Sequence, residues 1–172
     1  MTAIHAQIKK NPALAPSITA AFDTSGRNSQ IMEKIQKDLQ NTLGLQISLN
    51  NLDWKSYLKQ LTTDAPQIYR LGWLAPFRDP VIYLEIFTSG NPSNYSGWSS
   101  PVYDQLVSDV RRLPSGEARE AKVRQAEKML VDDEAIVVPI FHYTQVTAVS
   151  KRVEGFRVNP FSVILFREIT VK

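Results

Sequence analysis

The stretch from position 17 to position 75 alternates between strand-like and helix-like patterns, and this alternation restricts the fold more than any other feature. Strands are predicted at 17–22, 45–49 and 67–75, where β-branched, aromatic or alternating apolar residues gather. Helices are predicted at 30–42 and in a short segment from Trp54, where apolar residues recur at helical spacing. Strands that are joined by helical crossovers pair in parallel. The chain is therefore predicted to form an α/β fold with a mixed, mostly parallel sheet flanked by helices.

Local signals predict the ends of these two helices. Asn28 or Ser29 is placed to cap the first helix, and Gly44 stands just after it, where a left-handed residue commonly ends a helix. Asp53 is predicted to cap the second helix.

The second half of the chain is predicted to be helical before it returns to strands. Helices are expected at 81–87, 101–113 and 117–133, and strands at 136–150, with a bend near Pro139, and at 163–171. Three parts follow from this reading: a flexible leader over 1–16, an α/β lobe over 17–150, and a C-terminal segment over 151–172.

Composition narrows the classes of function. The chain has 172 residues, 43% of them hydrophobic, so it is long enough to bury a substantial core. The net charge of +3 comes from interspersed acids and bases, which does not favour nucleic acid as a partner. Because the sequence contains no cysteine, thiolate catalysis and cysteine-bound metal are excluded. Neither a cofactor nor a metal is expected.

The end of the predicted strand 67–75 is the best candidate for a ligand site. Pro76 and the pair Asp79-Pro80 follow it at once, so an aromatic strand breaks into a tight, rigid loop. Open α/β sheets bind ligands at such strand ends.

Arg70 is the most informative charge at this end. It stands two residues before Gly72, so both project from the same face of the strand. A guanidinium in a strand is unfavourable unless it meets a carboxylate or points into a cleft. Two interpretations remain open: Arg70 faces a ligand, or it forms a structural ion pair with an acid such as Asp53 or Glu85.

Aromatic residues near this end have two readings as well. Trp73 forms either the wall of a side-chain pocket or part of the core, and the adjacent loop favours the first. Tyr95 and Trp98 lie in a polar loop, where aromatic residues more often serve recognition than packing.

Catalytic patterns are scarce, and the chain is not expected to be an enzyme. His5 and His142 do not form a pair with ligand spacing. Ser56 and Lys59 match the Ser-x-x-Lys motif of penicillin-recognising hydrolases, but the companion motifs are missing. An exposed polar helix face explains these two residues more simply.

An ordered set of short motifs adds a family resemblance. The set consists of Leu43-Gly44-Leu45, Asp53-Trp54, Gly72-Trp73-Leu74-Ala75, Asp79-Pro80, Asn94-Tyr95, Tyr103-Asp104 and Val138-Pro139-Ile140. In this order it resembles the C-terminal lobe of the extracytoplasmic solute-binding proteins of the peptide/nickel ABC-transporter class. The likeness extends from about residue 17 to about residue 170.

The resemblance implies a periplasmic-binding-protein-like lobe that captures peptides or peptide-like solutes for import. Its partners would be the solute and, through the full-length protein, the membrane permease. The location would be periplasmic or otherwise extracytoplasmic, with a lipid anchor in some relatives. An oligosaccharide, an opine-like compound or a nickel chelate is the alternative solute. Because relatives are much longer and carry an export signal, the resemblance also implies an excised lobe.

The resemblance also implies a set of ligand-binding residues around the strand end. These are Arg70, Gly72, Trp73, Leu74, Ala75, Phe77, Asp79, Asn94 and Tyr95. One departure stands out, because the family usually has an aspartate where this chain has Pro76. This position therefore offers no carboxylate to a peptide amino group.

The tail carries a last expectation. In two-lobed relatives the final strand joins the other lobe, and residues 163–171 resemble that strand. An unpaired apolar strand is an open template for another chain. The tail is therefore expected to pair with the leader, to dock on its own sheet edge, or to cause self-association.

Overall fold

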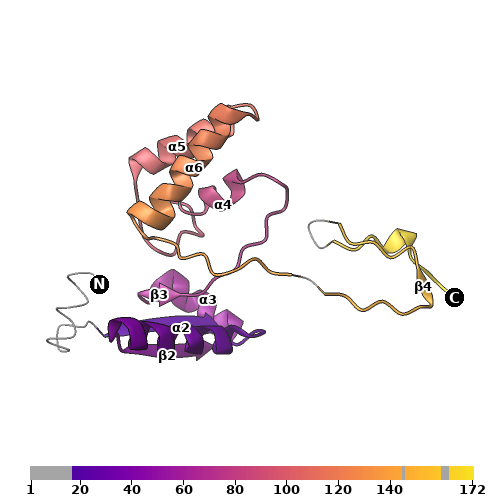
Figure 1. Cartoon of the computed structure of the whole chain (residues 1–172), viewed down its shortest axis with the longest axis horizontal. Coiled ribbons are helices and arrows are strands. Elements are labelled where there is room, and N and C mark those ends of the chain that lie inside the picture. Colours follow the sequence, from indigo (N-terminus) through magenta and orange to yellow (C-terminus); the bar gives the residue numbers. More distant parts are fainter. Residues whose placement is uncertain (1–16, 145, 160–162) are drawn as a thin grey trace. The chain divides into compact units, whose positions relative to one another are not determined.

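A computed structural model describes residues 17–144, 146–159 and 163–172 (Figure 1). The chain divides into two compact units, with the boundary between Gly72 and Trp73. The leader predicted over 1–16 lies outside the described residues.

The first unit is built on a three-stranded parallel sheet. The strands β1 (Ile18–Asp23), β2 (Ile47–Leu52) and β3 (Ile68–Tyr69) have the order β2-β1-β3, so β1 is central. Both neighbours run parallel to β1. The predicted parallel sheet is confirmed.

Helix α2 (Asn28–Leu43) packs against this sheet and encloses the first core (Figure 1). Ala20, Phe22, Met32 and Ile47 are buried together there. Gly44 ends α2 with a φ of 71°, as predicted, and its amide donates to the Gln40 carbonyl. Arg27, not Asn28 or Ser29, occupies the N-cap position, and no side chain caps the helix.

Helix α3 (Trp54–Thr63) contacts β1 as well. Asp53 caps it as predicted, because its side chain accepts hydrogen bonds from the amides of Lys55 and Ser56, both at 3.1 Å. Tyr57 is fully buried. Ala21, which points away from Ala20 and Phe22, is buried too, so both faces of the central strand are covered.

The strand predicted at 67–75 is much shorter than expected, and it lies at the edge of the sheet. Only Ile68 and Tyr69 form ladder pairs, with Ala20 and Ala21. The amide of Arg70 adds one more hydrogen bond, to the Ala21 carbonyl at 3.0 Å. Because β1 ends two residues later at Asp23, little backbone is left for a longer strand to pair with.

The second unit is built on helices. These are α4 (Val81–Glu85), α5 (Pro101–Arg112), α6 (Glu117–Lys128) and a π-helical turn over Met129–Asp133, all close to the predicted positions. Helices α5 and α6 lie side by side (Figure 1). Tyr103 is central to their core, and its hydroxyl donates to the Leu84 carbonyl at 2.7 Å.

The prediction of a strand over 136–150 is wrong, because the described residues of that range form no strand. The amides of Ile136 and Val137 instead donate to the Leu130 carbonyl at the end of the helices. The composition still suits a strand, but within the described ranges no second strand runs beside it.

The tail also differs from the prediction. Its described residues form a 3-10 turn (Phe166–Glu168) and the short strand β5 (Thr170–Val171), which pairs antiparallel with β4 (Val153–Glu154). The tail therefore pairs with a short strand that precedes it in the chain. This strand was not among the expected partners.

Candidate functional site

A concavity of about 360 Å³ opens in the first unit where β1 and β3 end. Its lining residues come from three segments of the chain and are Asp23, Ser25, Trp54, Arg70 and Gly72. Neighbouring parallel strands bring their carboxyl ends to one sheet edge, so Asp23 and Arg70 meet there although 47 residues separate them. Of the predicted site residues, Arg70 and Gly72 line this concavity.

Asp23 is the buried anion of the concavity, with only 3% of its side chain exposed. It accepts hydrogen bonds from the Ser25 amide at 3.2 Å, from the Ser25 hydroxyl, and from Asn28 Nδ2 at 2.9 Å. Asn28, which the sequence suggested as a helix cap, is thus used to hold this carboxylate.

Arg70 donates from Nη1 to Asp23 Oδ1 at 3.3 Å, and 17% of its side chain is exposed. The structure therefore supports the ion-pair interpretation, but the partner is Asp23 rather than Asp53 or Glu85. Glu85 pairs with Arg111 instead. Arg70 still reaches the surface of the concavity, so its pairing does not remove it from the site.

Tyr57 holds the backbone at Arg70 by a hydrogen bond. Its hydroxyl donates to the Arg70 carbonyl at 2.6 Å and lies 3.4 Å from the Ala21 carbonyl. Burial, assisted by the negative charge of Asp23, raises the pKa of Tyr57 well above its usual value. The phenol therefore stays protonated and acts as a hydrogen-bond donor between two neighbouring strands.

Trp54 supplies the aromatic surface of the concavity. It is the first residue of α3, and 52% of it is exposed although it packs against Tyr57 at a ring distance of 6.1 Å. An indole held in this way offers apolar area without a large loss of conformational entropy on binding.

Sequence reasoning missed Asp23, Ser25 and Trp54 as site residues. The signal for Asp23 was present, because a residue at the end of a central parallel strand meets the ends of its neighbours. The pairing with Arg70 was hidden, since no local pattern specifies which acid a distant arginine contacts.

The predicted site residues beyond Gly72 belong to the second unit. Trp73, Leu74 and Phe77 have exposed side chains, and Ala75 is half-buried. None of them lines the concavity of the first unit.

Asp79 braces the loop that follows. Both of its carboxylate oxygens accept hydrogen bonds from Arg119 Nη2, at 2.7 and 2.9 Å, and Oδ1 accepts the amide of Val81 at 2.9 Å. Burial disfavours the charged form of Asp79, but these hydrogen bonds outweigh that effect and hold its pKa below the usual carboxyl value. Arg119 also donates from Nε to the Val110 carbonyl, which ties the loop to α5.

Asn94 holds together the loop predicted to carry recognition aromatics. Its Nδ2 lies within 3.3 Å of the carbonyls of Phe87, Thr88 and Trp98. Trp98 packs edge-on against Tyr103 with ring centres 5.0 Å apart, so it contributes to packing. Tyr95 is half-buried.

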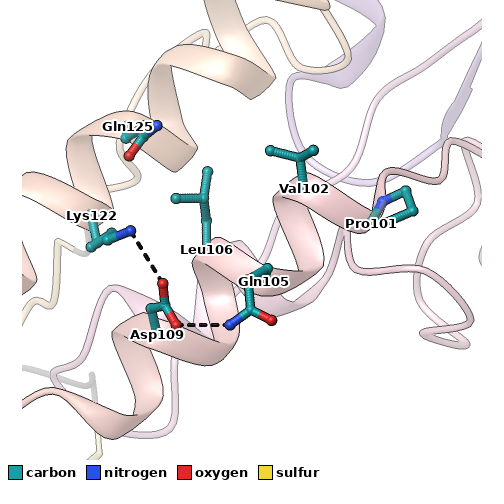
Figure 2. A pocket seen from close by; sticks show the side chains of 7 residues that line it. All are labelled: Pro101, Val102, Gln105, Leu106, Asp109, Lys122 and Gln125. Atoms are coloured by element: carbon teal, nitrogen blue, oxygen red, sulfur yellow. Dashed lines mark hydrogen bonds and ion pairs between the residues drawn. The ribbon is translucent and has the colours of Figure 1, made fainter.

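A second concavity, of about 440 Å³, lies between α5 and α6 (Figure 2). Val102 and Leu106 form its apolar side, and Asp109 faces Lys122 at 3.1 Å across the two helices. Hydrogen bonds from Gln105 and Lys122 lower the pKa of Asp109. These contacts explain the polar residues as links between the helices.

The serine and lysine of the hydrolase motif do not form a reactive pair around a pocket. The Ser56 hydroxyl hydrogen-bonds to the Asp53 carboxylate, which lowers the pKa of Asp53, and neither Ser56 nor Lys59 lines either concavity. Within the described ranges, no cluster of three or more His, Asp or Glu side chains is arranged to hold a metal ion. None of the helices there combines the length and apolar character that crossing a bilayer requires.

Comparisons with known proteins agree with the resemblance in the sequence. The dipeptide-binding protein DppE of Bacillus subtilis is 32% identical over 149 residues, which cover 87% of this chain and 27% of DppE. The oligopeptide-binding protein OppA of the same organism is 28% identical over 158 residues, or 91% of this chain and 29% of OppA. No protein-family model matches the chain.

Comparison with solved structures also finds peptide-binding proteins. The murein tripeptide binding protein MppA of Escherichia coli superposes with a TM-score of 0.84 and 25% identity, over 97% of this chain and 34% of MppA. The chain thus spans about a third or less of the length of these relatives. It belongs to the family of oligopeptide- and dipeptide-binding proteins, of which it represents one α/β portion.

Proposed function

We propose that the chain is the ligand-binding lobe of an ABC-transporter solute-binding protein and that it contributes half of a peptide site. The observation that carries this proposal is the concavity at the carboxyl edge of the parallel sheet. An exposed indole, a glycine and an ordered ion pair meet there, and small-molecule sites typically combine apolar surface with a few fixed polar groups.

The mechanism would involve binding without a chemical step. In a complete protein, a second lobe would close over the solute by hinge motion and so supply the remaining contacts. That the chain is not an enzyme fits its relatives, which are binding proteins by name.

Ligand-contacting residues are also proposed in the second unit, taken by itself. Trp73, Leu74 and Phe77 present exposed apolar side chains directly after Gly72 in the chain. Ala75, Asp79, Asn94 and Tyr95 complete the proposed set. The contacts of Asp79 and Asn94 favour a supporting role, because both side chains brace loops.

The partners and the location are proposed with the function. The solute is a peptide or peptide-like molecule, and the complete protein would deliver it to a membrane permease outside the cytoplasm, with or without a lipid anchor. Because Pro76 offers neither a charge nor an amide donor, the amino terminus of the peptide is proposed to meet another residue.

Calorimetry of the isolated chain with a tripeptide tests the half-site. One lobe buries only part of the solute, whereas complete sites bury about 70–90% of it. Binding is therefore expected to be no tighter than about millimolar, or about −4 kcal/mol. Micromolar binding would contradict a half-site and indicate a self-sufficient pocket.

A further inference from the structure

We propose that Asp23 determines specificity in the concavity by neutralising Arg70, so that this wall receives an uncharged part of a peptide rather than its C-terminal carboxylate. The inference rests on the proposed function and concerns which part of the solute this surface accepts.

The first step is that Asp23 is a buried carboxylate whose two oxygens accept several hydrogen bonds. Hydrogen bonds from Ser25 and Asn28 surround it, and almost none of its side chain is exposed. Hydrogen bonds of this kind satisfy a carboxylate that solvent hardly reaches. Asp23 borders the concavity with only 3% of its side chain exposed, so it offers little surface for direct contact with a ligand amine.

The second step is that Asp23 compensates the charge of Arg70. The two groups are 3.3 Å apart, in a place where 3% and 17% of their side chains are exposed. A ligand carboxylate at Arg70 would bring a second negative charge beside Asp23, and like charges at this distance oppose each other. The arginine is therefore a poor receptor for a further carboxylate.

The third step concerns the rest of the wall. Its other lining residues are Ser25, Trp54 and Gly72, none of which carries a charge. The formal charge of the lining is therefore zero. A backbone segment with an aliphatic or aromatic side chain suits such a surface, since it gains area on the indole without losing the hydration of a charge.

A pair of probes that differ only in charge tests the inference. The full 172-residue chain is titrated at neutral pH with N-acetyl-trialanine and with its C-terminal carboxamide, and amide and indole resonances are followed by NMR. Wild type is expected to bind both probes with dissociation constants within about twofold of each other. This comparison does not require any variant to fold.

Variants then assign the effect to Asp23. Asp23→Asn keeps the size and an acceptor oxygen but removes the charge, so the free acid is expected to bind about tenfold tighter than the carboxamide. The double variant Asp23→Asn/Arg70→Gln should lose that preference. Asp38→Asn is the matched control, because it removes the same charge from an exposed pair with Lys34 on α2 and should leave both constants unchanged.

The outcomes separate the inference from the proposed function. A wild-type preference of tenfold or more for the free acid would overturn the inference while leaving the peptide site in place. An Asp23→Asn variant that folds but shows no new preference would overturn it as well. If neither probe moves any resonance of the wild-type concavity at high millimolar concentration, the proposed function itself fails, and the inference fails with it.

Discussion

At the scale of single residues, the candidate site depends on a few buried polar contacts rather than on exposed charges. Tyr57, Asp23 and Arg70 form one connected group across β1 and β3. Buried hydrogen bonds of this kind matter mainly because their loss leaves a polar group without compensation.

Tyr57→Phe is expected to lower the free energy of unfolding by about 1–2 kcal/mol, because the Arg70 carbonyl loses its buried donor. Urea unfolding of the full chain measures this change. Tyr83→Phe is the control, since Tyr83 is largely exposed and its substitution should have little effect. Equal stability of the Tyr57 variant and wild type would show that the hydroxyl does not connect the two strands.

Asp79 gives a pH-dependent prediction. Because its folded pKa is lowered, the stabilisation is fully present above the unfolded pKa of about 4 and is lost as the pH falls through the folded value. Asp79→Asn should therefore cost about 1–2 kcal/mol at pH 7 and less near pH 2. Urea unfolding at both pH values measures this, with Asp38→Asn as control. A cost that is the same at both pH values would contradict the ion-pair account.

At the scale of elements, local patterns predicted the helices well, because apolar spacing, Gly44, Asp53 and Pro101 act within a few residues of one another. The strands were predicted less well. The length of β3 is set by where β1 ends, and the run 136–150 depends on a partner strand, so neither follows from its own residues. The same reason applies to the candidate site: Arg70 and Gly72 were named from the sequence and line the concavity, whereas Asp23, which also lines it, was not named.

Substitutions of Gly44 test whether its backbone conformation matters for the turn between α2 and β2. Its φ of 71° is left-handed, and no atom lies near the position that a side chain would occupy. Gly44→Ala is therefore expected to cost about 1 kcal/mol through backbone strain alone, whereas Gly44→Asn should cost less, because asparagine tolerates this conformation. Thermal unfolding distinguishes the two. Equal melting temperatures for the alanine and asparagine variants would contradict the strain argument.

At the scale of the whole molecule, the described part of the chain exposes many large apolar side chains between Val138 and Val149. Nearly all of this chain (97%) superposes on MppA, but it covers only 34% of MppA. We propose that this segment and the C-terminal segment 151–172 join further sheet in a complete protein. In the chain alone, such a surface favours association with a second copy.

Light scattering at increasing protein concentration is expected to show association of the full chain. The double variant Val138→Lys/Val146→Lys should reduce it, because these side chains are 73% and 92% exposed and charges oppose strand pairing. Val102→Lys, on α5 and 64% exposed, is the control and should leave association unchanged. A wild-type chain that stays monomeric at every concentration would contradict the proposal.

The central claim is that the concavity at the end of β1 and β3 is the peptide-binding surface, and NMR mapping tests it most directly. With N-acetyl-trialanine carboxamide near saturation, the largest shifts should be those of Ser25, Arg70 and Gly72 and of the Trp54 indole. The groove between α5 and α6, followed through Gln105 and Lys122, should show none. Shifts confined to that groove, or no shifts at all, would contradict the account.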